Sequence, residues 1–146
     1  MNKKVVVFSQ LDQDVLQRLQ AQYHVVVINP KQGDVNEQIR EQVKDADAMI
    51  GAGRLLNESN LATAQQLKII SSVSVGYDNY DLAYLNQKKI WLTNTPHVLT
   101  ETTADLAFTL LMSAARKVPY LDQWTKQGHW QRTVGEAQFG HDIFGR

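Results

Sequence analysis

The sequence contains no cysteine, and its charges balance, with 15 Lys and Arg against 15 Asp and Glu. Without cysteine the chain forms no disulfide and no cysteine-ligated metal site, which fits a reducing compartment. The absence of a basic excess argues against a nucleic-acid partner. The N-terminus runs into only four apolar residues, Val5–Phe8, which is too short for a signal peptide, and no stretch approaches a membrane span. We expect a soluble cytoplasmic protein that binds neither nucleic acid nor membranes.

Several motifs that carry chemistry are also missing. There is no Walker loop, no G-x-S-x-G nucleophile turn and no zinc signature. Gly51-Ala52-Gly53 is the nearest approach to a G-x-G-x-x-G loop, but Leu56 stands where the third glycine is needed. The first predicted strand is followed by neither the acid cluster of a receiver domain nor the hydroxyl-rich loop of a flavodoxin. The residues therefore reveal no recognisable catalytic machinery.

The polar residues that could suggest a site have simpler explanations. The histidines are scattered along the chain, at His24, His97, His129 and His141. None has an acid and a nucleophile near it, so each is expected to be structural or solvated. Asp78, Asn79 and Asp81 lack a further ligand at metal-binding spacing, and we expect them to cap the helix that follows and to stiffen the loop. No metal site is predicted.

Short apolar, β-branched runs alternate with amphipathic stretches. The runs, which read as strands buried on both faces, are Val5–Phe8, Val25–Ile28, Ala48–Ile50, Ile69–Ser72 and Ile90–Leu92. The helical stretches are Asp12–Tyr23, Asp34–Lys44, Ser59–Gln66 and Tyr80–Gln87, with Asp34 as an N-cap. This alternation predicts an α/β fold with a parallel five-stranded sheet and helices on both faces.

The last third of the chain has a different pattern. A helix is predicted over Thr100–Lys117, capped by Thr100 and stopped by Pro119. Its residues from Leu106 to Ala115 are apolar almost all round, so a missing domain, a second subunit or both must bury it. The following segment carries aromatic residues between glycines, at Trp124, Trp130 and Phe139. We expect that segment to lie against a partner surface.

The turn after the fourth predicted strand is Ser74-Val75-Gly76. In open parallel sheets, ligands bind outside the carboxyl ends of the strands, and a glycine there lets the backbone approach a ligand closely. The amides of Val75 and Gly76 are therefore candidates to hold a carboxylate. A plain turn with Gly76 at a positive φ explains the same residues. Arg54, after the third strand, faces the same edge. It could aid anion binding there, but we expect it to be a solvated surface residue.

Two long motifs in order resemble the D-isomer-specific 2-hydroxyacid dehydrogenases, in the glyoxylate/hydroxypyruvate reductase branch. Ile69–Asp81 is similar to the branch's substrate loop, Asn94–Arg116 to its interdomain helix, and Gly128-His129-Trp130 to the Gly-x-Trp of its dimerisation arm. The resemblance implies a flavodoxin-like substrate-binding lobe over residues 1–99. It implies the long interdomain helix and dimerisation arm over residues 100–146, without the nucleotide-binding Rossmann lobe.

The resemblance also implies roles for individual residues. Val75 and Gly76, with Ser74 in the same turn, match the positions that bind the substrate carboxylate. Leu99 matches a position lining the cleft, and Thr103 matches one that touches the nicotinamide end of the cofactor NAD(P). Trp130 matches an aromatic residue that reaches into a partner subunit, which implies a homodimer formed through Thr100–Arg146.

No position matches the catalytic Arg, Glu and His of these enzymes, and the cofactor loop is absent. The sequence therefore predicts the N-terminal part of an NAD(P)-dependent reductase of glyoxylate or hydroxypyruvate, inactive by itself. Two alternatives come from other classes. One is a non-catalytic dimerisation module built on the apolar helix and the Trp130 arm, and the other is a weak carboxylate-binding domain that uses Val75 and Gly76 alone.

Overall fold

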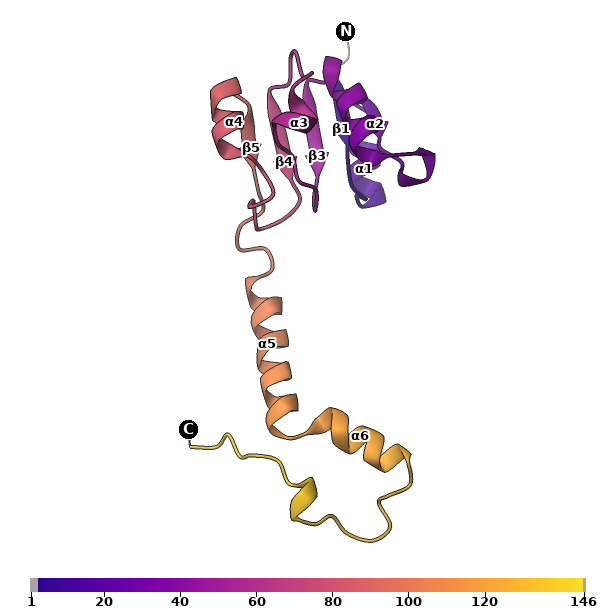
Figure 1. Ribbon diagram of the computed structural model, residues 1–146, viewed down its shortest axis with the longest axis vertical. Coiled ribbons are helices and arrows are strands. Elements are labelled where there is room, and N and C mark those ends of the chain that lie inside the picture. Colours follow the sequence, from indigo (N-terminus) through magenta and orange to yellow (C-terminus); the bar gives the residue numbers. More distant parts are fainter. Residues whose placement is uncertain (1–2, 146) are drawn as a thin grey trace. The chain divides into compact units, whose positions relative to one another are not determined.

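The structure, a computed structural model, describes residues 3–145. The chain divides into two compact units, Met1–Val98 and Leu99–Arg146. The first unit holds the sheet and the second consists of helices and irregular chain (Figure 1).

The first unit contains one parallel sheet of five strands in the order β2-β1-β3-β4-β5. The strands are β1 (Lys4–Val7), β2 (His24–Val27), β3 (Ala48–Gly51), β4 (Ile69–Ser72) and β5 (Trp91–Thr93). Each lies within one residue of the range predicted from the apolar runs, which confirms the parallel α/β fold. All five strands end at the same edge of the sheet, and the loops that follow β3 and β4 are neighbours there.

Four helices connect the strands: α1 (Gln13–Gln20), α2 (Val35–Gln42), α3 (Glu58–Leu61) and α4 (Leu82–Lys88). Short 3-10 turns, η1 (Pro30–Gln32) and η2 (Val43–Asp45), flank α2. A carboxylate or amide oxygen of the preceding residue caps each helix, and Asp34 does so for α2 as predicted. The expected helix Ser59–Gln66 is only one turn long, because beyond Ala62 the backbone bonds to other segments, as when the Gln65 N–H donates to Lys44 O.

The hydrophobic core fills one face of the sheet. Val6, Met49 and Ile70, on three adjacent strands, are fully buried. They pack into one cluster with residues of α2, α3 and α4, among them Ile39, Leu61 and Leu85. Successive residues of a strand point to opposite faces, so the strand residues next to Val6, Met49 and Ile70 face the other side of the sheet.

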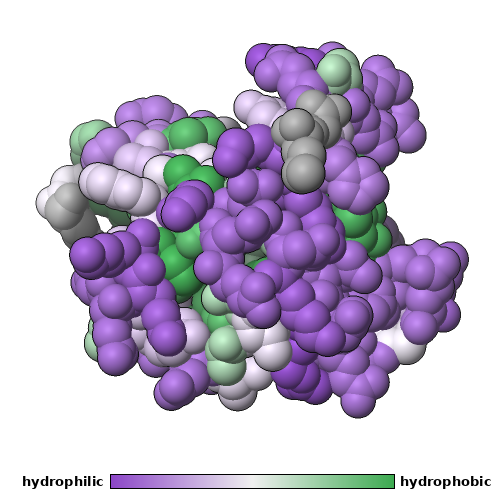
Figure 2. Space-filling model, turned by 90° about the horizontal axis from the view of Figure 1, so that it is seen from above, coloured by the Kyte–Doolittle hydropathy of each residue, from purple (hydrophilic) through white to green (hydrophobic). Residues whose placement is uncertain are grey.

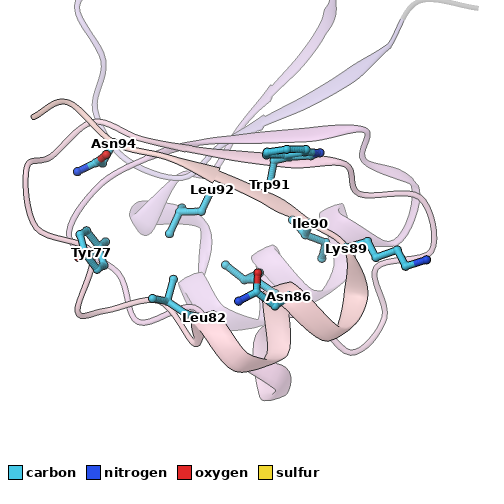
Figure 3. A pocket seen from close by; sticks show the side chains of 9 residues that line it. Tyr77, Leu82, Asn86, Lys89, Ile90, Trp91, Leu92 and Asn94 are labelled. Carbon is cyan, nitrogen blue, oxygen red and sulfur yellow. The ribbon is translucent and has the colours of Figure 1, made fainter.

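The opposite face is covered only in part. Leu19 of α1 lines a hollow on this face together with Val5, Ala48 and Ile69. Ala48 and Ile69 are half-buried there, and Trp91 is next to Ile69 in register on β5. Trp91 is 76% exposed. Figure 3 shows its ring on the side of β5 away from α4, while Leu92 points toward α4. Parallel sheets normally bury both faces, so this apolar surface is suited to packing against further chain.

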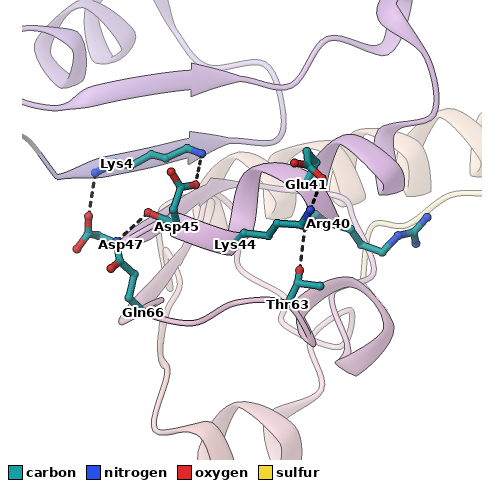
Figure 4. Close-up of polar contacts among 8 residues, drawn as sticks. All are labelled: Lys4, Arg40, Glu41, Lys44, Asp45, Asp47, Thr63 and Gln66. Carbon is teal, nitrogen blue, oxygen red and sulfur yellow. Dashed lines mark hydrogen bonds and ion pairs between the residues drawn. The ribbon is translucent and has the colours of Figure 1, made fainter.

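The edge where the strands begin is closed by polar contacts. Asp47 accepts hydrogen bonds from the Lys3 side chain (3.0 Å) and the Lys4 backbone N–H (2.9 Å), and these bonds lower the pKa of its carboxyl group. The Lys4 ammonium pairs with Asp45 in the same way, lowering the pKa of Asp45 (Figure 4). Figure 2, which views the molecule from above Figure 1, shows mostly hydrophilic residues, with hydrophobic residues visible between them.

The second unit contains α5 (Thr100–Ala115), α6 (Val118–Lys126) and a 3-10 turn, η3 (Glu136–Gln138). Two predictions about its helices were wrong. The cap of α5 is Leu99, whose side chain has no acceptor for a backbone N–H, and Thr100 is instead the first residue of the helix. Pro119 does not stop the helix: Lys117, at φ 54°, makes the turn, and Pro119 lies in the first turn of α6, where a missing N–H costs nothing.

The C-terminal segment folds back onto the junction of α5 and α6. The His141 N–H donates to Ala115 O (2.7 Å), and Lys117 Nζ donates to Ala137 O (3.1 Å). Trp124, one of the aromatic residues expected to lie against a partner surface, is within α6. These contacts leave the apolar residues of α5 uncovered by this unit: Leu106, Phe108, Leu110 and Leu111 are each more than half exposed. Within residues 3–145, no helix combines the length and apolar character that a membrane crossing needs.

Replacing Gly51 with alanine should destabilise the first unit. A Cβ at Gly51 would lie 2.7 Å from Cδ2 of the buried Phe8 ring, so either the ring or the end of β3 must move. We expect Gly51→Ala to lower the free energy of unfolding by about 1–3 kcal/mol, the usual cost of overpacking a core. Urea denaturation measures this value.

The matched control is Gly135→Ala, whose Cβ meets nothing closer than Gln138 Oε1 at 3.7 Å. In a double-mutant cycle, Phe8→Leu should recover part of the loss caused by Gly51→Ala, because the smaller side chain vacates the space. Equal stability of Gly51→Ala and Gly135→Ala would show that the Phe8 contact does not constrain this position.

Candidate functional site

The candidate site is the loop of residues 73–79 that follows β4. Ser74 Oγ donates a hydrogen bond to Gly76 O (2.6 Å), and the buried Ser72 hydroxyl lies 2.8 Å from Ser74 Oγ. This chain of hydroxyls ties the turn to the last residue of β4. Ser74 therefore orients the Val75–Gly76 backbone from within the loop.

A second anchor comes from the chain that follows β5. Asn94 Nδ2 donates to Val75 O (2.8 Å), and the Thr95 N–H donates to Ser74 O (3.0 Å). With both carbonyls engaged, the turn is held from the side of β5. Sequence reasoning missed this role of Asn94. The available signal was its place immediately after β5, because the ends of neighbouring parallel strands meet at one edge of the sheet.

The third anchor joins this loop to the one after β3. Asn79 Nδ2 donates to Arg54 O, and the Leu56 N–H donates to Asn79 O (2.8 Å). Asp81 caps α4 by accepting from the Tyr84 N–H (3.0 Å), and Asp78 is exposed. The predicted capping role is confirmed for Asp81, while Asn79 fastens two loops together.

These anchors engage carbonyl groups of the loop and leave backbone donors unused, among them the N–H groups of Val75 and Gly76. Among the residues that the structure describes, neither the Val75 N–H nor the Gly76 N–H donates a hydrogen bond to another protein atom. Both residues are exposed, Val75 by 44%. Adjacent free N–H groups on a fixed backbone are suited to an oxyanion, whose oxygens accept such bonds strongly.

The alternative of a turn with Gly76 at a positive φ is wrong. Gly76 is not among the glycines in the left-handed region. An added Cβ there would meet only Asp78 Oδ2, at 3.5 Å. The fold does not need glycine at this position, so the space that it leaves above the loop is available to a ligand.

The remaining predicted site residues belong to the second unit. Leu99 caps α5 and Thr103 lies one turn further on, its N–H donating to Leu99 O (2.9 Å). Trp130 follows α6 and is 59% exposed.

A cavity of about 740 Å³ adjoins the loop on the side of α4 and β5. Tyr77 and Asn94 lie at one end of it, and Leu82, Asn86 and Lys89 of the α4 side line the rest (Figure 3). Its walls offer no carboxylate or imidazole for proton transfer. Within residues 3–145, no three His, Asp or Glu side chains gather to hold a metal ion. The described site can bind an anion, but it has no group placed to transfer a proton.

Comparison with known proteins identifies the family of this chain. The family model of the D-isomer specific 2-hydroxyacid dehydrogenase catalytic domain matches residues 5–138. A probable 2-ketogluconate reductase of Dictyostelium discoideum is 35% identical over 143 residues, covering 97% of this chain and 43% of that protein. A glyoxylate/hydroxypyruvate reductase B of Yersinia enterocolitica is 35% identical, covering 98% of this chain and 44% of that protein.

Solved structures give the same result. An NADPH-dependent glyoxylate/hydroxypyruvate reductase from Sinorhizobium meliloti, in complex with NADP and malonate, superposes with a TM-score of 0.76 at 28% identity, covering 100% of this chain and 44% of that one. The TT0316 protein of Thermus thermophilus gives a TM-score of 0.77 at 30% identity, covering 96% of this chain and 45% of that one. This chain thus spans less than half the length of these relatives, and it belongs to the D-isomer specific 2-hydroxyacid dehydrogenase family.

Proposed function

We propose that this chain is the N-terminal, substrate-binding part of an NAD(P)-dependent reductase that converts glyoxylate or hydroxypyruvate to the D-2-hydroxy acid. The observation that carries the proposal is the pair of adjacent free N–H groups at Val75 and Gly76, in a turn where the carbonyl groups of Ser74, Val75 and Gly76 are all engaged. The reductase names of the relatives support the substrate class.

The loop would bind the substrate by its carboxylate. Each oxygen of a 2-keto acid carboxylate can accept a bond from one of the two N–H groups. Because Ser74, Asn94 and Asn79 already hold the backbone, little ordering remains to oppose binding. The keto carbon would then project away from the sheet edge, and the family resemblance assigns Leu99 to the lining of the cleft.

The described residues do not fit a dinucleotide. A pyrophosphate binds at a glycine-rich turn that opens a helix, with the helix N-terminus facing the anion. Here the loop after β1 has no glycine between Phe8 and Gln13, and the carboxylate of Asp12 already accepts from the Asp14 N–H (2.9 Å) at the start of α1. The proposal therefore assigns the binding of NAD(P) to another part of the longer protein. Thr103 is the one residue of this chain that would contact the cofactor.

Two uncovered apolar surfaces support the idea of further chain. One is the sheet face at Ala48, Ile69 and Trp91, and the other is the exposed side of α5. Surfaces of this kind are rarely left in water by a finished domain. In the longer protein they would pack against the remaining lobe.

The 146-residue chain should be inactive by itself, because hydride transfer needs a bound nicotinamide and an acid–base group that this chain does not place. A chimera that joins it to the unmatched part of a glyoxylate/hydroxypyruvate reductase relative should oxidise NADPH when glyoxylate is added. The decrease in NADPH absorbance measures the activity of the chain alone and the activity of the chimera. Turnover by the chain alone, or an inert chimera that is folded and binds NADPH, would contradict the proposal.

In that chimera, Gly76→Val should raise KM for glyoxylate by about tenfold or more, since a branched side chain over the two N–H groups removes hydrogen bonds to a charged group. Gly76→Ala should have a smaller effect of the same sign. Neither change should lower the melting temperature, because the position is open in the fold. An unchanged KM in Gly76→Val would exclude these amides as the carboxylate site.

A second candidate function is a dimerisation module, favoured by the exposed apolar side of α5 beside a segment that folds on itself. We propose that Thr100–Arg146, including Trp130, pairs with a second copy. Sedimentation of the 146-residue chain should then give a discrete dimer, and the double change Phe108→Ser and Leu110→Gln should convert it to monomer. The control Trp91→Gln, on the open sheet face, should leave the dimer intact. Wild-type monomer at all concentrations would contradict this function.

A further inference from the structure

A second polar cavity, of about 300 Å³, lies between α2, α3 and the loop after β3. Its charged lining residues are Arg40 and Arg54, and its polar ones are Asn36, Asn57, Ser59 and Asn60. No acidic residue lines it. Two guanidinium groups at one small cavity repel each other unless something negative lies between them.

Neither guanidinium is neutralised by protein. Across residues 3–145, neither Arg40 nor Arg54 forms an ion pair or donates a side-chain hydrogen bond. Both side chains are half-buried, whereas Arg54 was expected to be a solvated surface residue. Partial removal from water raises the cost of leaving these charges without a counter-charge.

The nearby acids do not line the cavity. Glu41 pairs with Lys44, and Figure 4 shows the Arg40 side chain running away from that pair. Glu58, between the lining residues Asn57 and Ser59, is exposed and does not itself line the cavity. The charged residues of the lining are therefore both positive.

The amide oxygens of Asn36 and Asn57 already accept hydrogen bonds within the protein. Asn60 Nδ2 donates to Asn36 Oδ1 (3.4 Å), while the Ser59 hydroxyl (2.7 Å) and the Ser59 N–H (3.0 Å) both donate to Asn57 Oδ1. What remains on Asn36 and Asn57 is the NH₂ group, a donor. The NH₂ groups of Asn36 and Asn57 and the guanidinium groups of Arg40 and Arg54 therefore give the lining more hydrogen-bond donors than acceptors.

The backbone beneath the two arginines is fixed. Thr63 Oγ1 donates to Arg40 O (2.8 Å), and Asn79 Nδ2 donates to Arg54 O. The second contact comes from the same Asn79 that fastens the Val75–Gly76 loop. The donors are thus carried by anchored segments, which lowers the cost of ordering them around a ligand.

We propose that this cavity binds a phosphate group between Arg40 and Arg54. Phosphate offers several acceptor oxygens to the planar fork of each guanidinium and to the two amides, and the small volume suits a small group. The site is separate from the Val75–Gly76 amides and does not depend on the proposed reductase function.

The phosphate could be free or part of an ester. A neighbouring cavity of about 690 Å³ shares Gly53 and Arg54 and continues over Ser9, Ile28 and Asn29. An organic phosphate bound at the arginines would place its body there. Inorganic phosphate and a sugar phosphate, glucose 6-phosphate, therefore distinguish the two sources.

The test is calorimetric titration of the 146-residue chain with inorganic phosphate, accompanied by backbone amide shifts. Phosphate should shift the amides of Gly53, Arg54 and Asn57 and leave Val75 and Gly76 unchanged. Arg40→Gln and Arg54→Gln should each weaken binding by about tenfold or more, which corresponds to one charged hydrogen bond. Arg18→Gln, an exposed arginine of α1, is the matched control and should bind as the wild type does.

With glucose 6-phosphate, tighter binding and additional shifts at Ser9 and Asn29 would assign the site to a phosphate ester, and equal affinity would assign it to free phosphate. Arg40→Lys and Arg54→Lys keep the charge but lose the planar guanidinium that can donate two parallel hydrogen bonds. Both variants should therefore retain only part of the phosphate affinity. The proposal is overturned if phosphate shifts no amide around the cavity, or if the Arg→Gln variants, shown to be folded by circular dichroism, bind phosphate like the control.

Discussion

The structure of the site depends on hydrogen bonds from side chains to backbone carbonyls across neighbouring loops. Asn79 joins the loop after β4 to the loop after β3, and Asn94 joins it to the chain after β5. Each amide satisfies a carbonyl that would otherwise compete for the free N–H groups. Val75 and Gly76 therefore present donors outward without any special backbone angle. The same Asn79 also fixes the segment that carries Arg54, so one side chain supports both of the proposed anion sites.

The apolar surfaces follow from an uneven distribution of helices. Three helices cover the face of the sheet that holds Val6, Met49 and Ile70, whereas on the other face Trp91 at the β5 edge is 76% exposed. In the second unit, the returning segment packs against the end of α5 and leaves its middle exposed. Polar chemistry at the loops and apolar surface beside it are the features expected of one part of a larger enzyme.

The sequence predicted what depends on local pattern. Buried β-branched runs located all five strands, and Asp34 identified a cap, because both signals lie within a few residues. Pro119 was misread, since proline is equally suited to follow one helix or to begin the next, and Lys117 in the left-handed region decided between them. The Val75–Gly76 turn was found by its place after a strand. The roles of Asn79, Asn94 and Arg40 were not, because each depends on segments brought together only by the fold.

The most direct test of this account is a crystal structure of the chimera with oxamate, an unreactive analogue of the keto acid substrates. The account predicts both carboxylate oxygens within about 2.7–3.2 Å of the Val75 and Gly76 nitrogens, the range of an N–H···O hydrogen bond. The loop should keep its contacts to Asn79 and Asn94 unchanged. A carboxylate bound elsewhere in the cleft, with these two N–H groups facing water, would contradict it.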